Sequence, residues 1–192
     1  MITNQTIALD RVKYINPEEF KKLLDATRKE SELYYYAFFI CGNLGLRVSE
    51  LLTLKKSDFD LHNNIVTIMT LKQRADKIDK MEIPLEVIKL IKPYLKTIKK
   101  PDGLLFPYGK RTLQYKFDYF AGKAGIKIKG TNTKKGRGIH CLRHLRGFLL
   151  AETTRDPYTI AKALRHSSIN TSMAYVHLKD YNATIQKVRI IK

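Results

Sequence analysis

A tyrosine near the C-terminus follows basic side chains of types that suit chemistry on a phosphate. His140 and Arg143 share one short stretch with a further histidine, and His166 precedes Tyr175 by nine residues. A tyrosine hydroxyl is a nucleophile once its proton is removed, and nearby cations are expected to favour the anion. The arginine fork matches phosphate oxygens, and histidine exchanges protons near neutral pH. These residues therefore predict that Tyr175 attacks a phosphodiester.

Two residues far upstream complete this chemistry. Arg47 follows a glycine-containing turn and supplies a second guanidinium for the phosphate. Lys72 opens a polar segment between two expected strands, where it can protonate the leaving 5′-oxygen. The chain contains no phosphate-binding P-loop motif, no HExxH motif and no carboxylate cluster for two magnesium ions. No cofactor or metal is therefore expected.

The composition fits one domain with a polyanionic partner. The chain has 192 residues, of which 44% are hydrophobic, and its net charge is +18. Such an excess of positive charge is best explained by nucleic acid, here double-stranded DNA. The two cysteines form no CxxC pair, which predicts a reducing cytoplasm and no structural zinc site. No apolar run approaches the ~18 residues that a membrane span needs.

The periodicity of apolar residues predicts a mostly α fold with a small antiparallel sheet. Gly42 and Gly45 are expected to loosen the second helix, and Ser49 to cap a short helix from Glu50 to Leu54. Tyr34 to Tyr36 are interpreted as packing residues. Strands are expected at 65–69 and 80–84, and helices at 16–29, 31–41, 85–98, 109–124, 140–152, 156–164, near 170 and at 181–187. Residues 1–14 show no firm pattern and are interpreted as a leader or linker stub.

Four segments in order resemble the catalytic domain of tyrosine recombinases of the phage-integrase family. Gly45–Leu51 (GLRVSEL) is similar to the first arginine motif, and the hairpin ending at Glu82–Leu85 (EIPL) to the lysine hairpin. His140–His144 (HCLRH) resembles the HxLRH motif of the family. Leu164–His166 (LRH), followed by Tyr175, resembles its LGH…Y motif. The resemblance runs from about residue 16 to residue 175, so a catalytic domain is expected at 15–179.

The resemblance implies a site-specific recombinase that integrates, excises or resolves DNA through a covalent 3′-phosphotyrosine, without metal or ATP. Glu50 is then expected to stabilise the short helix next to Arg47 without contacting the substrate itself. The family acts as a tetramer on DNA, and the isolated chain is expected to be a monomer. The residues that carry the reaction are expected to be Arg47, Lys72, His140, Arg143, His166 and Tyr175. The residues that contact DNA are expected to be Arg74, Lys77, Lys134, Lys135, Arg137 and Arg165.

Several features depart from the family pattern or leave alternatives open. Arg165 stands where the family usually has glycine. The N-terminal DNA-clamping domain of the family is not present in this sequence, so a fragment of a longer integrase is expected, with an unusually minimal enzyme as the alternative. The lysine and isoleucine content points to an archaeal virus or plasmid. Residues 180–192 form an apolar tail that packs either on its own domain or on a neighbouring protomer. A type IB topoisomerase and a DNA-binding protein without catalysis are the alternative functions.

Overall fold

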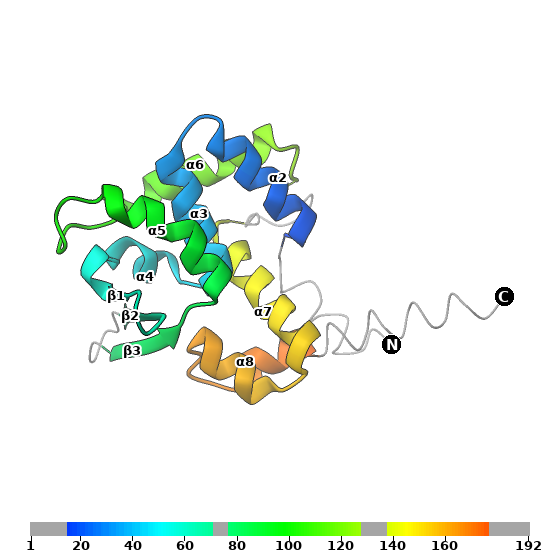
Figure 1. Cartoon of the computed structure of the whole chain (residues 1–192). Coiled ribbons are helices and arrows are strands. Elements are labelled where there is room, and N and C mark those ends of the chain that lie inside the picture. Colours follow the sequence, from blue (N-terminus) through cyan, green and yellow to red (C-terminus); the bar gives the residue numbers. More distant parts are fainter. Residues whose placement is uncertain (1–14, 71–76, 128–137, 177–192) are drawn as a thin grey trace.

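The computed structural model describes residues 15–70, 77–127 and 138–176. These ranges are mostly helical with one small antiparallel sheet, as the sequence predicts, and none of their helices is long and apolar enough to cross a bilayer. The leader at 1–14 and the tail helix at 181–187 lie outside the described residues. The helices are α2 (Pro17–Arg28), α3 (Glu32–Leu44), α4 (Val48–Thr53), α5 (Leu85–Thr97), α6 (Lys110–Lys123), α7 (His140–Thr154) and α8 (Pro157–Leu164), and residues 170–176 are also helical (Figure 1).

The sheet has three strands, in the order β1 (Phe59–Asp60), β2 (Ile65–Thr70) and β3 (Lys77–Glu82). The two-residue strand β1 was not predicted, and β3 begins three residues before the expected position at Lys80. Thr70 of β2 pairs with Lys77 of β3, so the hairpin is closed up to the segment 71–76. Val66 and Ile68 are fully buried on one face of β2, because alternate side chains of a strand point to the same side.

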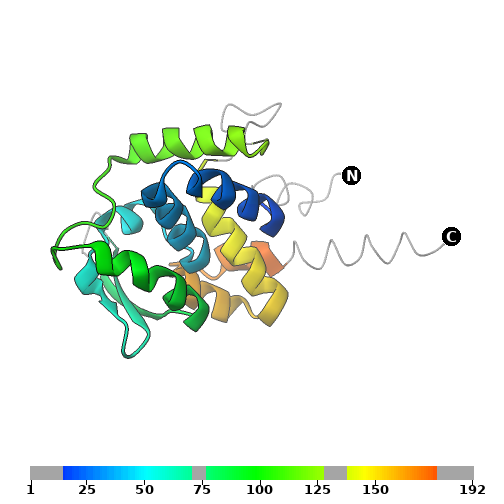
Figure 2. The ribbon, with the colours of Figure 1, turned by 45° about the horizontal axis from the view of Figure 1, so that its top comes forward.

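Helix α3 forms the centre of the main core and is buried on nearly every side, between α2, α5 and α7 (Figure 2). Tyr34, Tyr35 and Tyr36 are all buried, which confirms that they are packing residues. Tyr34 stacks on Tyr108 with ring centroids 4.8 Å apart. Tyr36 stacks on Tyr94 at 4.3 Å. Such aromatic pairs add to the free energy of burial and fix α3 as the support for its neighbours.

Two local predictions around the first arginine are wrong. Gly42 does not loosen α3, which runs on to Leu44. A Cβ atom at Gly42 would lie 2.5 Å from the ring of Phe20, so this glycine lets α2 approach α3 closely. Gly45 ends the helix with φ of 62°, a conformation that favours glycine. Ser49 is not the cap of α4; Arg47 holds that position, and its backbone N–H donates to the Glu50 carboxylate at 2.8 Å.

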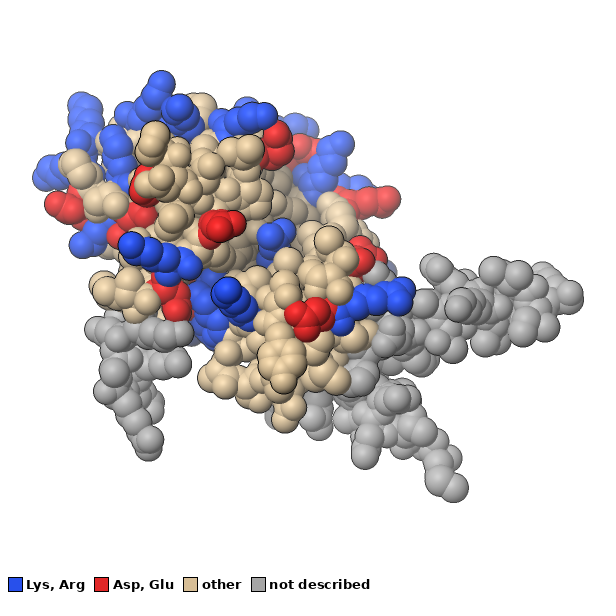
Figure 3. All heavy atoms as spheres, turned by 60° about the horizontal axis from the view of Figure 1, so that its bottom comes forward, with Lys and Arg blue, Asp and Glu red and all other residues tan. Residues whose placement is uncertain are grey.

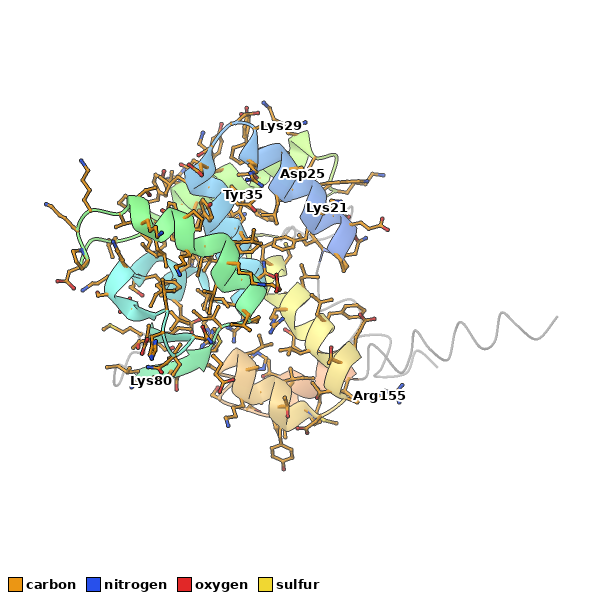
Figure 4. The ribbon with its side chains drawn as sticks, viewed as in Figure 1. Lys21, Asp25, Lys29, Tyr35, Lys80 and Arg155 are labelled. Carbon is orange, nitrogen blue, oxygen red and sulfur yellow. The ribbon has the colours of Figure 1, made fainter. Side chains whose placement is uncertain are left out.

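Helices α7 and α8 form a second layer with a small core of its own. Arg155, with φ of 54°, turns the chain between them, and the Asp156 side chain caps α8 by accepting hydrogen bonds from two backbone N–H groups. Lys80 of β3 and Arg155 lie on opposite sides of α8, so α8 lies between the hairpin and the end of α7 (Figure 4). The small core contains Leu164 from α8 and Tyr175 from the helical segment 170–176, together with Ala151 and Ile160.

Candidate active site

The fold brings together residues that are far apart in the sequence. Arg47 begins α4, His140 and Arg143 lie in the first turn of α7, His166 follows α8 and Tyr175 lies in the segment 170–176. Helix α7 packs on both α3 and α8, and Arg143 in its first turn donates to Gly45 O after α3 and to Leu164 O of α8. Five of the six residues predicted to carry the reaction are described, and the sixth, Lys72, lies outside the described residues.

The carboxylate of Glu50 connects the arginines of the site. Its side chain is fully buried and lies 2.6 Å from Arg47 Nη1, 2.9 Å from Arg165 Nη2 and 3.8 Å from Arg143 Nη1. The Thr70 hydroxyl at the end of β2 donates to Oε1 of the same carboxylate at 3.1 Å, the oxygen that Arg47 Nη1 also binds. Burial alone would raise the pKa of Glu50, but Arg165 and hydrogen bonds from Arg47 lower it to about 2. The carboxylate is therefore charged at all physiological pH values.

Arg143 is held by backbone carbonyls from two other elements. Its side chain is 2% exposed, and Nη1 donates to Gly45 O at 2.7 Å while Nη2 donates to Leu164 O. Burial, and then the charge of Arg47, lower its pKa to about 10, so it remains a cation near neutral pH. Each Nη atom carries a second hydrogen, which leaves donors for a phosphate. Arg47 is 33% exposed and is the more accessible of the two guanidinium groups.

Tyr175 is buried beside two histidines. It is 2% exposed, and its Oη lies 2.7 Å from Nδ1 of His144. The ring of His166 is nearly parallel to the tyrosine ring, with centroids 6.2 Å apart. The tyrosine ring rests on α7 at Gly147, where an added Cβ would lie 2.5 Å from Cζ. The glycine is therefore required for this close approach.

Arg143 favours the Tyr175 anion, as expected, but burial of the hydroxyl has the larger effect in this conformation. Burial raises the pKa of Tyr175 to about 12, and Arg143 offsets only part of that rise. Removing the hydroxyl from water destabilises the anion more than one buried guanidinium stabilises it. The Tyr175 hydroxyl is therefore protonated in this conformation and shares a hydrogen bond with His144.

The three histidines of the site are neutral near pH 7. Burial, followed by the charges of neighbouring basic groups, lowers the pKa of His144 to about 3 and of His166 to about 4, and it also lowers the pKa of His140. His166 Nδ1 lies 2.8 Å from the buried Ser172 hydroxyl, which fixes the ring. The rings of His140 and His144 meet edge to face at 4.8 Å. These histidines act as hydrogen-bonding groups rather than as cations in this conformation.

His144 was not among the residues predicted to carry the reaction, although the sequence contains a signal for it. It lies four residues after His140 and three before Gly147, so all three share one face of α7. That face is the one that receives Tyr175. The helical spacing was visible, but the identity of the side chain packed against it depends on how α7 and residues 170–176 meet.

Arg165, which was expected to contact DNA, is buried in the free protein. Its side chain is 6% exposed, and its guanidinium lies 2.9 Å from the Glu50 carboxylate. Lys77 lies at the start of β3. The other predicted DNA contacts, Arg74, Lys134, Lys135 and Arg137, lie outside the described residues.

The His166 side of the site opens into a cleft between the hairpin and α8. The cleft has a volume of about 390 Å³, and Thr70, Asp79, Lys162, Arg165 and His166 are among its lining residues. On the face viewed from below, lysine and arginine side chains spread along the upper rim with acidic side chains between them (Figure 3). Basic and acidic side chains are therefore interspersed on this exposed face, whereas Arg143 and Arg165 of the site are buried.

Known proteins share both the sequence pattern and the fold. Residues 13–182 match the model of the phage integrase family. The tyrosine recombinase XerA of Thermococcus onnurineus is 28% identical over 94% of this chain and 64% of its own length. The tyrosine recombinase XerH of Helicobacter pylori is 30% identical over 91% of this chain and 51% of its own length. The chain thus spans between about half and two thirds of these relatives.

Solved structures agree with this assignment. The crystal structure of a XerA recombinase superposes with a TM-score of 0.70 at 26% identity, over 94% of this chain and 64% of that one. A XerH recombinase bound to its palindromic difH substrate after cleavage superposes with a TM-score of 0.69 at 28% identity, over 93% of this chain and 53% of that one. Because the family model covers most of the sequence and the fold agrees, the chain belongs to the phage integrase family.

Proposed function

We propose that this chain is the catalytic part of a site-specific recombinase that cleaves and rejoins DNA through a covalent 3′-phosphotyrosine at Tyr175. The observation that supports this most directly is the setting of Tyr175. It lies against the ring of His166 and is hydrogen-bonded to His144, which directly follows Arg143. A tyrosine hydroxyl beside fixed cations and neutral imidazoles is suited to attack on a phosphodiester.

In the proposed reaction Tyr175 Oη attacks the phosphorus, a new Oη–P bond forms, and the bond from phosphorus to the 5′-oxygen breaks. Arg47 and Arg143 neutralise the charge that develops on the non-bridging oxygens. His166 and His140, neutral near pH 7, donate or accept hydrogen bonds there. Lys72 protonates the leaving 5′-oxygen, which departs as a hydroxyl. The phosphodiester energy is retained in the tyrosyl ester, so rejoining needs neither ATP nor a metal.

The state of Tyr175 indicates what must change when DNA binds. The hydroxyl starts protonated because burial disfavours its anion. A phosphate placed between Arg143 and Tyr175 orients the arginine N–H groups towards the reacting atoms, and the Oη proton then passes to a hydrogen-bonding neighbour such as His144. The Oη proton is therefore expected to leave as the Oη–P bond forms, rather than before the attack.

The proposed partner is double-stranded DNA, in the cytoplasm or nucleoid of a host cell. The net charge of +18 favours a polyanion, and the XerH relative was solved with a DNA substrate. Strand exchange requires two cleaved duplexes, so we propose a homotetramer on DNA and a monomer in isolation. Integration, excision and resolution all use this same chemistry.

Incubation with a pool of nicked duplexes of random sequence tests the proposal. A nick near the cleavage site lets the short released fragment diffuse away, so the covalent protein–DNA adduct accumulates and survives a denaturing gel. The wild-type chain is expected to form this adduct, and Tyr175→Phe is expected to bind the same DNA without forming it. Equal adduct from both proteins, or none from the wild type at matched DNA occupancy, would refute the proposal.

A further inference from the structure

Arg165 occupies the end of α8 and turns its side chain into the protein. Its guanidinium Nη2 lies 2.9 Å from Glu50 Oε2 and 3.4 Å from Gly45 O. Its Nη1 lies 3.1 Å from Ala163 O and 3.2 Å from the sulfur of Met81 on β3. One side chain therefore contacts α8, the hairpin and the turn that carries the first arginine.

The position is unfavourable for arginine unless these contacts offset its cost. The backbone of Arg165 has φ of 55° and ψ of 44°, a left-handed conformation that glycine adopts more easily than any other residue. The Nε–H group is buried and has no hydrogen-bond partner among the described residues, which costs further free energy. An arginine at this position is therefore explained by what its guanidinium does at Glu50.

Arg165 determines how the Glu50 carboxylate is shared. It is the guanidinium partner of Oε2, which also accepts from the backbone N–H of Arg47 at 2.8 Å, while Arg47 Nη1 binds Oε1 at 2.6 Å. Arg143 Nη1 lies 3.8 Å from Oε2, beyond hydrogen-bond distance, and donates instead to Gly45 O. Without the Arg165 side chain, Oε2 would be open to Arg143, and a direct bond to the carboxylate would neutralise the arginine that the phosphate needs.

The backbone of the same residue fixes the other arginine. The carbonyl of Arg165 accepts a hydrogen bond from Arg47 Nη2 at 3.1 Å, and this carbonyl is presented by the left-handed turn at the end of α8. Arg165 thus holds Arg47 through its backbone carbonyl and Glu50 through its guanidinium.

We propose that Arg165 is a positioning residue for the phosphate site, which keeps Arg143 beyond hydrogen-bond distance of the Glu50 carboxylate and keeps Arg47 correctly oriented. This inference rests on the proposed DNA cleavage. It differs from a direct DNA contact, because Arg165 would then act on the rate of cleavage and leave the affinity for DNA nearly unchanged.

Two variants and one control separate these roles. Arg165→Met keeps the aliphatic stem but removes the charge and the donors, and Arg165→Lys keeps the charge without the fork. Lys21→Met is the control, since Lys21 is an exposed basic residue on α2, away from the cleft, and its loss changes the net charge equally. Each protein is assayed for DNA affinity across a range of salt concentrations and for single-turnover adduct formation at saturating nicked duplex.

We expect Arg165→Met to keep the wild-type salt dependence and to form the adduct about 10- to 100-fold more slowly at saturating DNA, the size of effect that misplaced catalytic groups produce. Arg165→Lys should recover part of that loss, and Lys21→Met should form the adduct at the wild-type rate once DNA is saturating. A log–log salt slope reduced by about one in Arg165→Met, with a normal rate at saturation, would show a phosphate contact and overturn the proposal.

A folded Arg165→Met protein with the wild-type rate and the wild-type salt slope would also overturn it, because no positioning role would remain. Folding is checked by the urea unfolding curve of each variant. Failure of the wild-type chain to form any adduct is a separate result, since it would remove the proposed cleavage itself and not only the role of Arg165 in it.

Discussion

Gly147→Ala is expected to displace Tyr175, the proposed nucleophile, from its position against α7. The added Cβ would lie 2.5 Å from Cζ of Tyr175, 2.6 Å from Cε1 and 2.9 Å from Cε2. Ordinary contacts between carbon atoms begin near ~3.5 Å, so the ring must move by about 1 Å. That movement breaks the 2.7 Å contact between Tyr175 Oη and His144 Nδ1.

The net change in stability combines two opposed contributions. Overpacking costs about 1–3 kcal/mol, whereas alanine is favoured over glycine inside a helix by about 0.5–1 kcal/mol. Gly147→Ala should therefore lower the free energy of unfolding by between about 0 and 2.5 kcal/mol. In a Tyr175→Ala background the overpacking disappears, so the same substitution should stabilise the protein by about 0.5–1 kcal/mol. The coupling free energy between the two positions is thus expected to be about 1–3 kcal/mol.

Urea unfolding of the two single variants, the double variant and the wild type measures this coupling. Gly122→Ala provides the matched control, because Gly122 lies in α6 and a Cβ there would meet nothing within 4 Å. The control should be as stable as the wild type or slightly more stable. Adduct formation by Gly147→Ala should fall by about 10²-fold, since a nucleophile displaced by 1 Å attacks poorly. Additive changes in the free energy of unfolding, together with a wild-type cleavage rate, would refute the packing of Tyr175 against Gly147.

Three further predictions follow from the charges of the site. Glu50→Gln leaves buried guanidinium groups without their carboxylate, so it should lower the free energy of unfolding by about 3–5 kcal/mol in urea titrations; a loss below ~1 kcal/mol would contradict this. Because burial lowers the pKa of His144 to about 3 and of His166 to about 4, the unfolded chain binds more protons than the folded one between about pH 4 and 6.5. Stability should therefore fall as the pH drops through that window, and His144→Asn should flatten the melting temperature against pH; an unchanged profile would contradict the assignment. Lys72→Ala should slow cleavage by about 10²–10⁴-fold, and a 5′-bridging sulfur in the substrate should restore it; absence of rescue would assign Lys72 to phosphate binding instead.

Much of the scaffold was predictable, because its elements carry strong local signals. The start of α2 at Pro17, the apolar α3 and the β-branched strand β2 each agree closely with the sequence-based expectation. Strand β1 was missed, because two residues show no periodicity and are defined only by their pairing with β2. Gly42 was misinterpreted for a similar reason. A glycine within a helix signals a break locally, but here it makes room for Phe20 of another helix.

The residue types of the site could be predicted from the sequence, but their pKa values and ion pairs could not. Motif spacing selected Arg143 and Tyr175, whereas the raised pKa of Tyr175 depends on burial that only the packing of α7, α8 and residues 170–176 creates. Arg165 shows the same limit. An arginine among basic residues favours a phosphate contact, and its ion pair with Glu50 depends on a turn more than a hundred residues upstream. Long-range contacts of this kind leave no local signal in the sequence.

The chemical nature of the covalent link tests the central claim most directly. The adduct formed with nicked duplex can be digested with protease and nuclease, and the modified peptide can be located by mass spectrometry. We expect a nucleotide joined through its 3′-phosphate to Tyr175. We also expect a released strand with a free 5′-hydroxyl, which a polynucleotide kinase can phosphorylate directly. A modified peptide that contains another tyrosine such as Tyr181, or a released strand that already carries a 5′-phosphate, would contradict it.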